Sequence, residues 1–359
     1  MKILLSIVAL IPAIGLTFVV MSEPAADPLK AALAKPSATG LLVLQIVEGT
    51  QSAKLGVRPG DRVAVVFPTG DPFLSAFFGA ISAGAIPVPL PPPPRIGAHA
   101  DHAGPSGAML RSAGARVVLI APRMREPFTP VAAAAGVDVD VRVLEDLPSA
   151  GPYEHATADP DEVAIVQFSS GSTVRPKPVA LSHRAVLTHA RTLDGLWPEQ
   201  PDRHTGVSWL PLYHDMGLIG CLFPALIVPT TLTLLAPESF VARPANWLRA
   251  ISNYQASISP APNFAFAIAN ERITDAQMDG VDLSSWRVAP NGAEPIAPDV
   301  LRAFERRFSR WGLRPETLTP VYGLAEASLA LTFSEPGRRF RTRRYDRGQL
   351  AKTGRAVPD

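Results

Sequence analysis

The sequence is poor in cysteine and in charged residues. Cys221 is the single cysteine, so no internal disulfide can form, which is typical of a reducing compartment. The apolar residues around it, Leu218 to Leu226, predict a buried packing residue rather than a nucleophile. Charged residues make up only 18% of the chain and the net charge is +2. Since no basic patch with interleaved aromatic residues occurs either, a nucleic-acid partner is not expected.

The low charge content is balanced by a high apolar content. Hydrophobic residues make up 47% of the 359 positions, enough for a large core and for two or three domains. The 38 prolines oppose long helices. Apolar β-branched runs alternate with helical patterns from Val63 to Asp161 and again from Val163 to Leu331. This alternation predicts an α/β fold of two subdomains, residues 56–155 and 156–335, with mainly parallel sheets flanked by helices.

One long hydrophobic run opens the sequence. Residues 3–20 are almost all apolar and follow Lys2, which fits a signal peptide or a short membrane anchor. A third interpretation is a mis-assigned start, with Met21 as the true first residue. Contact of segment 1–21 with a membrane therefore stays open. Residues 22–55 are rich in alanine and proline at first, and we predict a linker or an atypical N-terminal extension.

A hydroxyl-rich turn follows the apolar run Val163 to Phe168, which is predicted to be a buried strand. Beyond a second short run, Ser182 occupies the N-cap position of a helix predicted over Arg184 to Leu196. Small residues let backbone N–H groups converge on an anion, and hydroxyls add further donors. The pattern predicts a polyphosphate site, and an ordinary serine-rich loop is the alternative. The residues of this predicted site are Ser169, Ser170, Gly171, Ser172, Thr173 and Lys177.

Three further segments follow the turn in order, at Trp209 to Leu218, Asn291 to Pro295 and Tyr322 to Ala327. Together the four segments resemble the adenylate-forming superfamily of acyl-activating ligases. With the proline-rich stretch Pro87 to Pro94, they are most similar to the fatty acyl-AMP ligase branch. The resemblance extends from Gly56 to the C-terminus and implies the two-subdomain large domain of such an enzyme, with the small C-terminal domain absent.

This resemblance implies ATP-dependent activation of a fatty or other carboxylic acid to acyl-AMP, with release of pyrophosphate. The implied cofactors are ATP and Mg²⁺, and the implied catalytic residues are Lys177, His214 and Glu326. Lys177 would reach the β- and γ-phosphates, His214 would lie near the carboxylate of the acid, and Glu326 would bind Mg²⁺. Tyr322 would stack on adenine. The remaining residues implied to bind the nucleotide are Gly292, Ala293, Glu294 and Gly323.

The resemblance also implies partners and a location. An acyl carrier protein is a candidate acceptor after adenylation. Because the reaction consumes ATP, we expect a cytoplasmic protein, membrane-associated if segment 1–21 is an anchor.

The sequence departs from the family pattern in its phosphate turn. Val174 and Pro178 stand where the family usually has glycine, which puts loop mobility and grip on phosphate in question. The ribose-binding aspartate, the hinge and the small domain with the catalytic lysine would follow Asp359, so an incomplete and weakly active chain is expected. A non-catalytic remnant that binds a nucleotide or an acyl group is the alternative function.

A membrane-anchored, PDZ-like interaction protein is a further, lower-ranked alternative. The stretch Gly40 to Val63 also resembles the groove end of a PDZ domain, but the strand–helix–strand pattern after it favours the ligase. His99 and His102 are predicted to be solvated loop histidines rather than metal ligands. The segment 336–359, with six arginines between Arg338 and Arg347, is either a solvated basic tail or the start of an insertion typical of the ligase branch.

Overall fold

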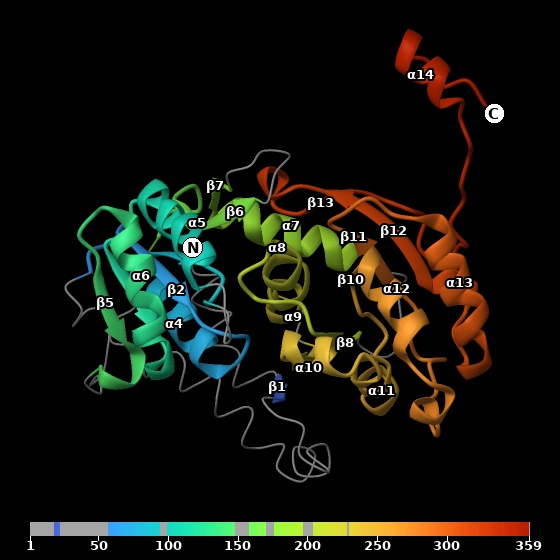
Figure 1. Ribbon diagram of the computed structural model, residues 1–359, viewed down its shortest axis with the longest axis horizontal. Helices are drawn as coiled ribbons and strands as arrows, with labels where there is room; N and C mark the ends of the chain where they lie inside the picture. Colours follow the sequence, from blue (N-terminus) through green and yellow to red (C-terminus); the bar gives the residue numbers. More distant parts are fainter. Residues whose placement is uncertain are drawn as a thin grey trace.

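The computed structural model describes residues 18–21, 57–93, 99–147, 158–169, 176–196, 204–227 and 230–358. Sheets flanked by helices follow one another along the long axis of the molecule (Figure 1). The strands pair mainly in parallel, which confirms the predicted α/β class. The predicted boundary between residues 155 and 156 lies outside the described residues.

The first sheet has the strand order β3-β2-β4-β5 and is parallel throughout. Parallel sheets are covered by helices on both faces, so their strands are apolar throughout. In strand β2 of this sheet, Val63, Ala64 and Val65 are at most 1% exposed. The parallel β2–α4–β3 connection is the one that the ligase-like pattern predicted, and it differs from a PDZ hairpin. The elements are β2 (Arg62–Val66), α4 (Asp71–Ser82), β3 (Ile86–Pro89), α5 (His99–Ala113), β4 (Val117–Ile120), α6 (Arg125–Ala135) and β5 (Asp140–Val143).

His99 and His102 belong to helix α5, so their prediction as loop residues was wrong. Helix α5 contains Pro105, and the turns before this proline are helical as well as those after it. The Nε2 atom of His102 lies 3.0 Å from the hydroxyl of Ser106, one helical turn further on. In the described part of the chain, no three histidine, cysteine or acidic side chains cluster as a metal site.

The second region contains one extended layer of strands. β8 (Thr205–Ser208) and β9 (Thr231–Leu235) pair in parallel. Ile258 bridges Gly206 and Val288, and so connects β8 to the sheet β10-β11-β12-β13. The strands of that sheet are β10 (Ala261–Pro262), β11 (Ala289–Gly292), β12 (Leu318–Gly323) and β13 (Ala330–Phe333), of which the last is antiparallel to its neighbour.

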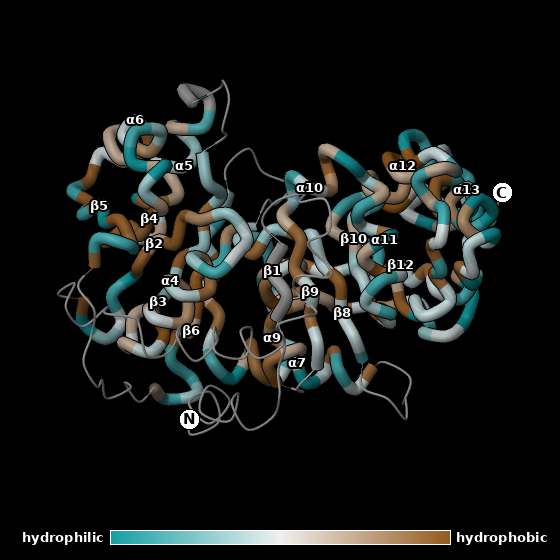
Figure 2. Tube along the Cα trace, turned by 90° about the horizontal axis from the view of Figure 1, so that it is seen from below, coloured by the Kyte–Doolittle hydropathy of each residue, from teal (hydrophilic) through white to brown (hydrophobic). Residues whose placement is uncertain are grey.

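Helices cover this layer and enclose a core of aromatic side chains. The centre of that core is Trp247, whose ring centroid lies 5.2–6.3 Å from those of its neighbours Phe240, Phe266, Trp286 and Phe304. Figure 2 shows hydrophobic segments in the first sheet at β2 and at α9 (Phe223–Ile227). The flanking helices are α10 (Pro237–Ala242), α11 (Ala245–Asn253), α12 (Asn263–Arg272) and α13 (Pro298–Phe308).

Both ends of the described chain bear on sequence predictions. Within the N-terminal hydrophobic run, β1 (Phe18–Met21) pairs with β9 in parallel. Among the described residues, no helix is long and apolar enough to cross a membrane. At the other end, α14 (Arg347–Thr353) stands away from the body (Figure 1). Arg339 is nevertheless tied to the body by an ion pair of 2.7 Å with the largely buried carboxylate of Glu305.

The hydroxyl-rich turn connects an antiparallel hairpin, β6 (Val163–Ser169) and β7 (Lys177–Ser182). Both strands were predicted from their apolar runs. Helix α7 (His183–Gly195) follows at once, and the Ser182 hydroxyl accepts a hydrogen bond from the backbone N–H of Ala185 at 3.2 Å. The predicted N-cap is therefore confirmed. β6 also contacts β3, so the hairpin lies against the first sheet.

Replacing Ser182 with alanine is expected to lower the free energy of unfolding by about 1 kcal/mol, because one N–H of the first turn of α7 loses its partner. Urea denaturation followed by circular dichroism measures the change. Thr188→Ala, at an exposed position of the same helix, is the control and should change stability by a few tenths of that amount. Equal effects of the two substitutions would contradict a capping role for Ser182.

Candidate active site

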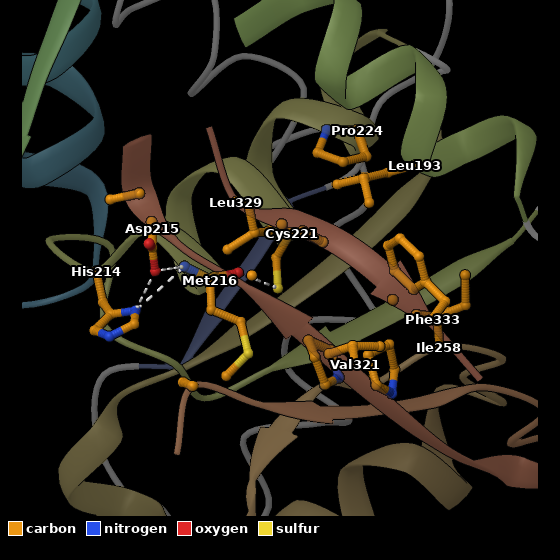
Figure 3. A pocket seen from close by; sticks show the side chains of 18 of the residues that line it. Leu193, His214, Asp215, Met216, Cys221, Pro224, Ile258, Val321, Leu329 and Phe333 are labelled. Atoms are coloured by element: carbon orange, nitrogen blue, oxygen red, sulfur yellow. Dashed lines mark hydrogen bonds and ion pairs between the residues drawn. The ribbon is translucent and has the colours of Figure 1, made fainter. Parts of the chain in front are cut away.

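A cavity of about 880 Å³ lies among the ends of the hairpin β6–β7, helix α7, strands β8 and β9, and the β11–β12–β13 sheet. Figure 3 shows His214 and Asp215 on one side of it and Leu193, Pro224 and Phe333 on the opposite side. The cavity brings together residues from segments that are far apart in the sequence. Of the predicted site residues, those that line it are Ser169, His214, Ala293, Glu294, Tyr322, Gly323 and Glu326.

The hairpin contributes the end of β6. Ser169 is 9% exposed, and its hydroxyl makes no hydrogen bond among the described residues. A buried hydroxyl without a partner costs free energy, so this atom fits a ligand that can accept from it. Lys177 pairs opposite Ser169 in the hairpin but is exposed and does not line the cavity. Ser170, Gly171, Ser172 and Thr173 lie outside the described residues.

The β12–β13 hairpin presents an aromatic face and a carboxylate. Tyr322 is 63% exposed although it lies on a strand, so one face of its ring is accessible. The turn η8 (Ala325–Ala327) carries Glu326, which is exposed and makes no hydrogen bond or ion pair within the described ranges. This turn contacts both β6 and β7. A carboxylate that has no partner among the described residues and lies near the hairpin β6–β7 is of a kind that can bind a hydrated Mg²⁺ ion.

A histidine of α7 holds this hairpin in place. The backbone N–H of Ala330, the first residue of β13, donates to Nε2 of His189 at 3.1 Å. Burial lowers the pKa of His189, which favours the neutral ring, and the bond from Ala330 places its one proton on Nδ1. The position of the Tyr322 and Glu326 segment thus depends on a contact that the sequence did not indicate, because the two partners are 141 positions apart.

The end of β11 approaches β12 closely. A Cβ atom on Gly292 would lie 2.9 Å from the carbonyl oxygen of Val321, so only glycine fits there without a shift. Ala293 follows with φ 68°, a left-handed conformation that turns the chain away from the sheet. Glu294 then accepts a hydrogen bond of 2.6 Å from the N–H of Phe264, at the start of α12. Its carboxylate therefore stabilises a helix N-terminus as well as lining the cavity.

His214 begins a short helical segment beside the cavity. Its Nδ1 lies 2.8 Å from a carboxylate oxygen of Asp215 and 3.2 Å from the backbone N–H of Met216, which donates, so the ring is held at its Nδ1 side. The Nε2 atom remains for a ligand. The side chain of His214 is 42% exposed and that of Asp215 15%, so the pair is fixed at its protein end and accessible at the other.

A π-helical turn forms the apolar wall next to His214. After α8 (Asp215–Gly217), residues Leu218–Leu222 form one π-helical turn, a local widening that often occurs at functional sites. Gly220 and Cys221 of this turn line the cavity. Burial raises the pKa of the Cys221 thiol to about 12, and its Sγ donates to the carbonyl of Met216 at 3.3 Å. Cys221 is thus a packing residue, as predicted.

Several cavity residues were missed by the sequence reasoning. Leu193 was predicted only as part of a helix, and Asp194 and His204 were not singled out. The parallel pairing of β8 with β9 and the end of helix α7 bring these residues together, and no local sequence motif indicates either arrangement. The residues that line the cavity and were not predicted include Leu193, Asp194, His204, Gly206, Thr230, Thr231, Leu329 and Phe333.

Comparison with known proteins agrees with this geometry. The sequence model of the AMP-binding enzyme family matches residues 52–359. A 4-hydroxyphenylalkanoate adenylyltransferase of Mycobacterium marinum is 39% identical over 300 residues, which are 81% of this chain and 48% of the relative. A long-chain-fatty-acid–AMP ligase of Mycobacterium bovis is 37% identical over 316 residues, 86% of this chain and 53% of the relative. The chain thus spans about half the length of these relatives.

The solved structures give the same family. A fatty acyl-adenylate ligase from L. pneumophila, solved with acyl adenylate and pyrophosphate, superposes with a TM-score of 0.83 at 28% identity. The match covers 100% of this chain and 61% of that one. An adenylation domain of a keto acid-selecting peptide synthetase shares the fold, with a TM-score of 0.74 at 21% identity. The chain belongs to the AMP-binding enzyme family and is similar to its fatty acyl-AMP ligases.

Proposed function

We propose that this chain carries the ATP and acid sites of an enzyme that converts a carboxylic acid to acyl-AMP. The observation that carries the proposal is the cavity itself. It contains an exposed tyrosine ring, a carboxylate and a buried serine hydroxyl that both lack partners among the described residues, and an apolar passage. The tyrosine ring, the carboxylate and the serine hydroxyl suit a nucleoside triphosphate, and the apolar passage suits the body of an organic acid.

In the proposed reaction, a carboxylate oxygen of the acid attacks the α-phosphorus of ATP. An O–P bond forms, the bond from the α-phosphorus to the bridging oxygen breaks, and pyrophosphate leaves with the electron pair. The protein's part is to position the two substrates and to balance the charge that develops. Ser169 would donate to a phosphate oxygen, Tyr322 would stack on adenine, and His214 would face the acid's carboxylate. Ser170, Gly171, Ser172 and Thr173 would form a turn that binds the phosphates. Lys177, which follows this turn, would reach the β- and γ-phosphates.

Mg²⁺ would be held by Glu326 and by phosphate oxygens, where it would neutralise charge on the triphosphate. The lone carboxylate fits this ion, since Mg²⁺ in phosphate sites takes few protein ligands. Gly292 and Gly323 would let the backbone approach the nucleotide, with Ala293 and Glu294 forming the wall opposite Tyr322. After adenylation, an acyl carrier protein is the proposed acceptor.

The names of the relatives suggest two kinds of acid for this cavity, a long-chain fatty acid and a 4-hydroxyphenylalkanoate. Both have an apolar body that fits the wall made by Met216, Cys221, Leu329 and Phe333. Isothermal titration calorimetry with ATP·Mg²⁺ and with a non-hydrolysable acyl-AMP analogue tests the proposal. Saturable binding of both ligands is expected. A folded sample that binds neither would refute the function, and pyrophosphate release with an acid would separate an active ligase from a chain that only binds.

Gly220→Leu is expected to weaken binding of a long acyl-AMP analogue by between about fivefold and 150-fold, the range for overpacking an apolar site by 1–3 kcal/mol. A Cβ atom at this position would already lie 2.8 Å from the Cδ2 atom of Leu329, so a larger side chain occupies the passage. ATP binding should change by less than about twofold, since Gly220 lies on the apolar wall. Calorimetry with the two ligands measures both effects, and an equal loss of ATP binding would contradict the assigned place of the acyl chain.

A further inference from the structure

The apolar passage ends at a group of polar side chains on the amino ends of two strands. His214 follows the carboxyl end of β8, whereas His204 directly precedes its amino end. The four residues of β8 span about 13 Å at roughly 3.3 Å each, so the two histidines lie beyond opposite ends of this strand. Thr205 pairs with Thr231, and this parallel register places His204 beside Thr230. Asp194, at the end of α7, completes the group, and all three residues line the cavity.

The contact with Arg287 defines the tautomer of the His204 ring, which lines the cavity. The Arg287 guanidinium lies 3.4 Å from Nδ1 of His204. Because a guanidinium can only donate, Nδ1 must accept, and the ring proton is then on Nε2. Burial lowers the pKa of His204, and the charge of Arg287 lowers it further while Asp194 opposes the change. The ring is therefore neutral at pH 7, with one defined donor.

Thr230 and Asp194 supply the complementary groups. The Thr230 hydroxyl is enclosed by protein, yet it makes no hydrogen bond to any residue that the structure describes. A hydroxyl in such a place can both donate and accept, and leaving it unpaired costs free energy. The Asp194 carboxylate accepts only. A donor, an acceptor and a hydroxyl thus meet at the end of a passage whose walls are apolar.

We propose that this polar end binds a neutral hydroxyl at the tail of the acid, either an aliphatic alcohol or a phenol. A hydroxyl can donate to Asp194 while it accepts from His204 or Thr230. A second carboxylate at the tail would be repelled by Asp194, and an ammonium group would face the Arg287 charge behind His204. A plain hydrocarbon tail would leave the polar groups without partners. The inference rests on the proposed function, because it assigns the far end of the same acid.

Two acyl-AMP analogues of equal chain length test the inference, one ending in a methyl group and one in a hydroxyl. The hydroxyl-ended analogue is expected to bind about tenfold more tightly in calorimetry, the value of roughly one hydrogen bond. In Thr230→Val and in Asp194→Leu this ratio should fall toward one, mainly through weaker binding of the hydroxyl-ended analogue. An analogue ending in a carboxylate should bind more weakly than either.

Two control variants distinguish loss of the hydroxyl site from a general loss of stability. Thr192→Val removes an exposed hydroxyl of α7 that donates to the carbonyl of Thr188, and Glu271→Leu removes an exposed carboxylate on α12. Both should keep the wild-type preference. Equal binding of the methyl- and hydroxyl-ended analogues by the wild-type chain would overturn the inference and leave the proposed function intact. Failure of both to bind would instead refute the proposed function.

Discussion

Tyr322→Ala is expected to weaken ATP binding by between about fivefold and 150-fold, which corresponds to the 1–3 kcal/mol typical of one aromatic ring stacked on a base. The ring is 63% exposed on a strand of the cavity wall, so its removal costs little core packing. The loss should be the same with and without Mg²⁺, since stacking involves no metal. Calorimetry with ATP in magnesium and in a chelator measures both values.

Glu326→Gln gives the contrasting result that makes this prediction specific. It should weaken ATP binding only when Mg²⁺ is present, because the amide is a poorer ligand for the ion than the carboxylate. Glu271→Gln, on the exposed face of α12, is the control and should behave as the wild type. If Tyr322→Ala and Glu326→Gln showed the same dependence on magnesium, the separate roles assigned to ring and carboxylate would be wrong.

The hairpin β6–β7 and the start of α7 were predictable because the sequence patterns that indicate them are local. The apolar run of β6, the hydroxyl-rich turn and the cap at Ser182 lie within 20 consecutive residues, and the cap bond is formed as predicted. The exposed ring of Tyr322 and the glycine at 323 could be found from their motif as well. Each of these segments lies at or next to the carboxyl end of a strand, β6, β11 or β12.

Other parts of the site could not be predicted, because their partners lie far apart in the sequence. The carboxylate of Glu294 accepts from the N–H of Phe264 in the first turn of α12, 30 positions earlier, and His189 accepts from a strand residue 141 positions later. His204 and Thr230 lie together because β8 and β9 start side by side, and Asp194 joins them from the end of α7. Lys177 shows the reverse case. It was predicted in the site from its place in the sequence, whereas in the structure it is exposed and does not line the cavity.

Gly323→Ala should remove nucleotide binding altogether and lower the free energy of unfolding by about 3 kcal/mol, the upper range for overpacking. A Cβ atom on Gly323 would lie 1.8 Å from the carbonyl oxygen of Leu329. That oxygen belongs to the backbone and accepts from the N–H of Leu324 at 2.7 Å, so it cannot rotate away as a side chain could. The β12–β13 hairpin must open instead, and this displaces both Tyr322 and Glu326.

The matched control for this prediction is Gly195→Ala, at the last residue of α7, where a Cβ atom would meet no other atom within 4 Å. It should leave nucleotide binding unchanged and stabilise the chain by up to about 1 kcal/mol, because alanine loses less backbone entropy than glycine in a helix. Urea denaturation and ATP calorimetry on the two variants measure both quantities. A Gly323→Ala chain that kept ordinary ATP affinity would show that the hairpin tolerates a side chain there, and that Tyr322 and Glu326 do not need this backbone contact for their positions.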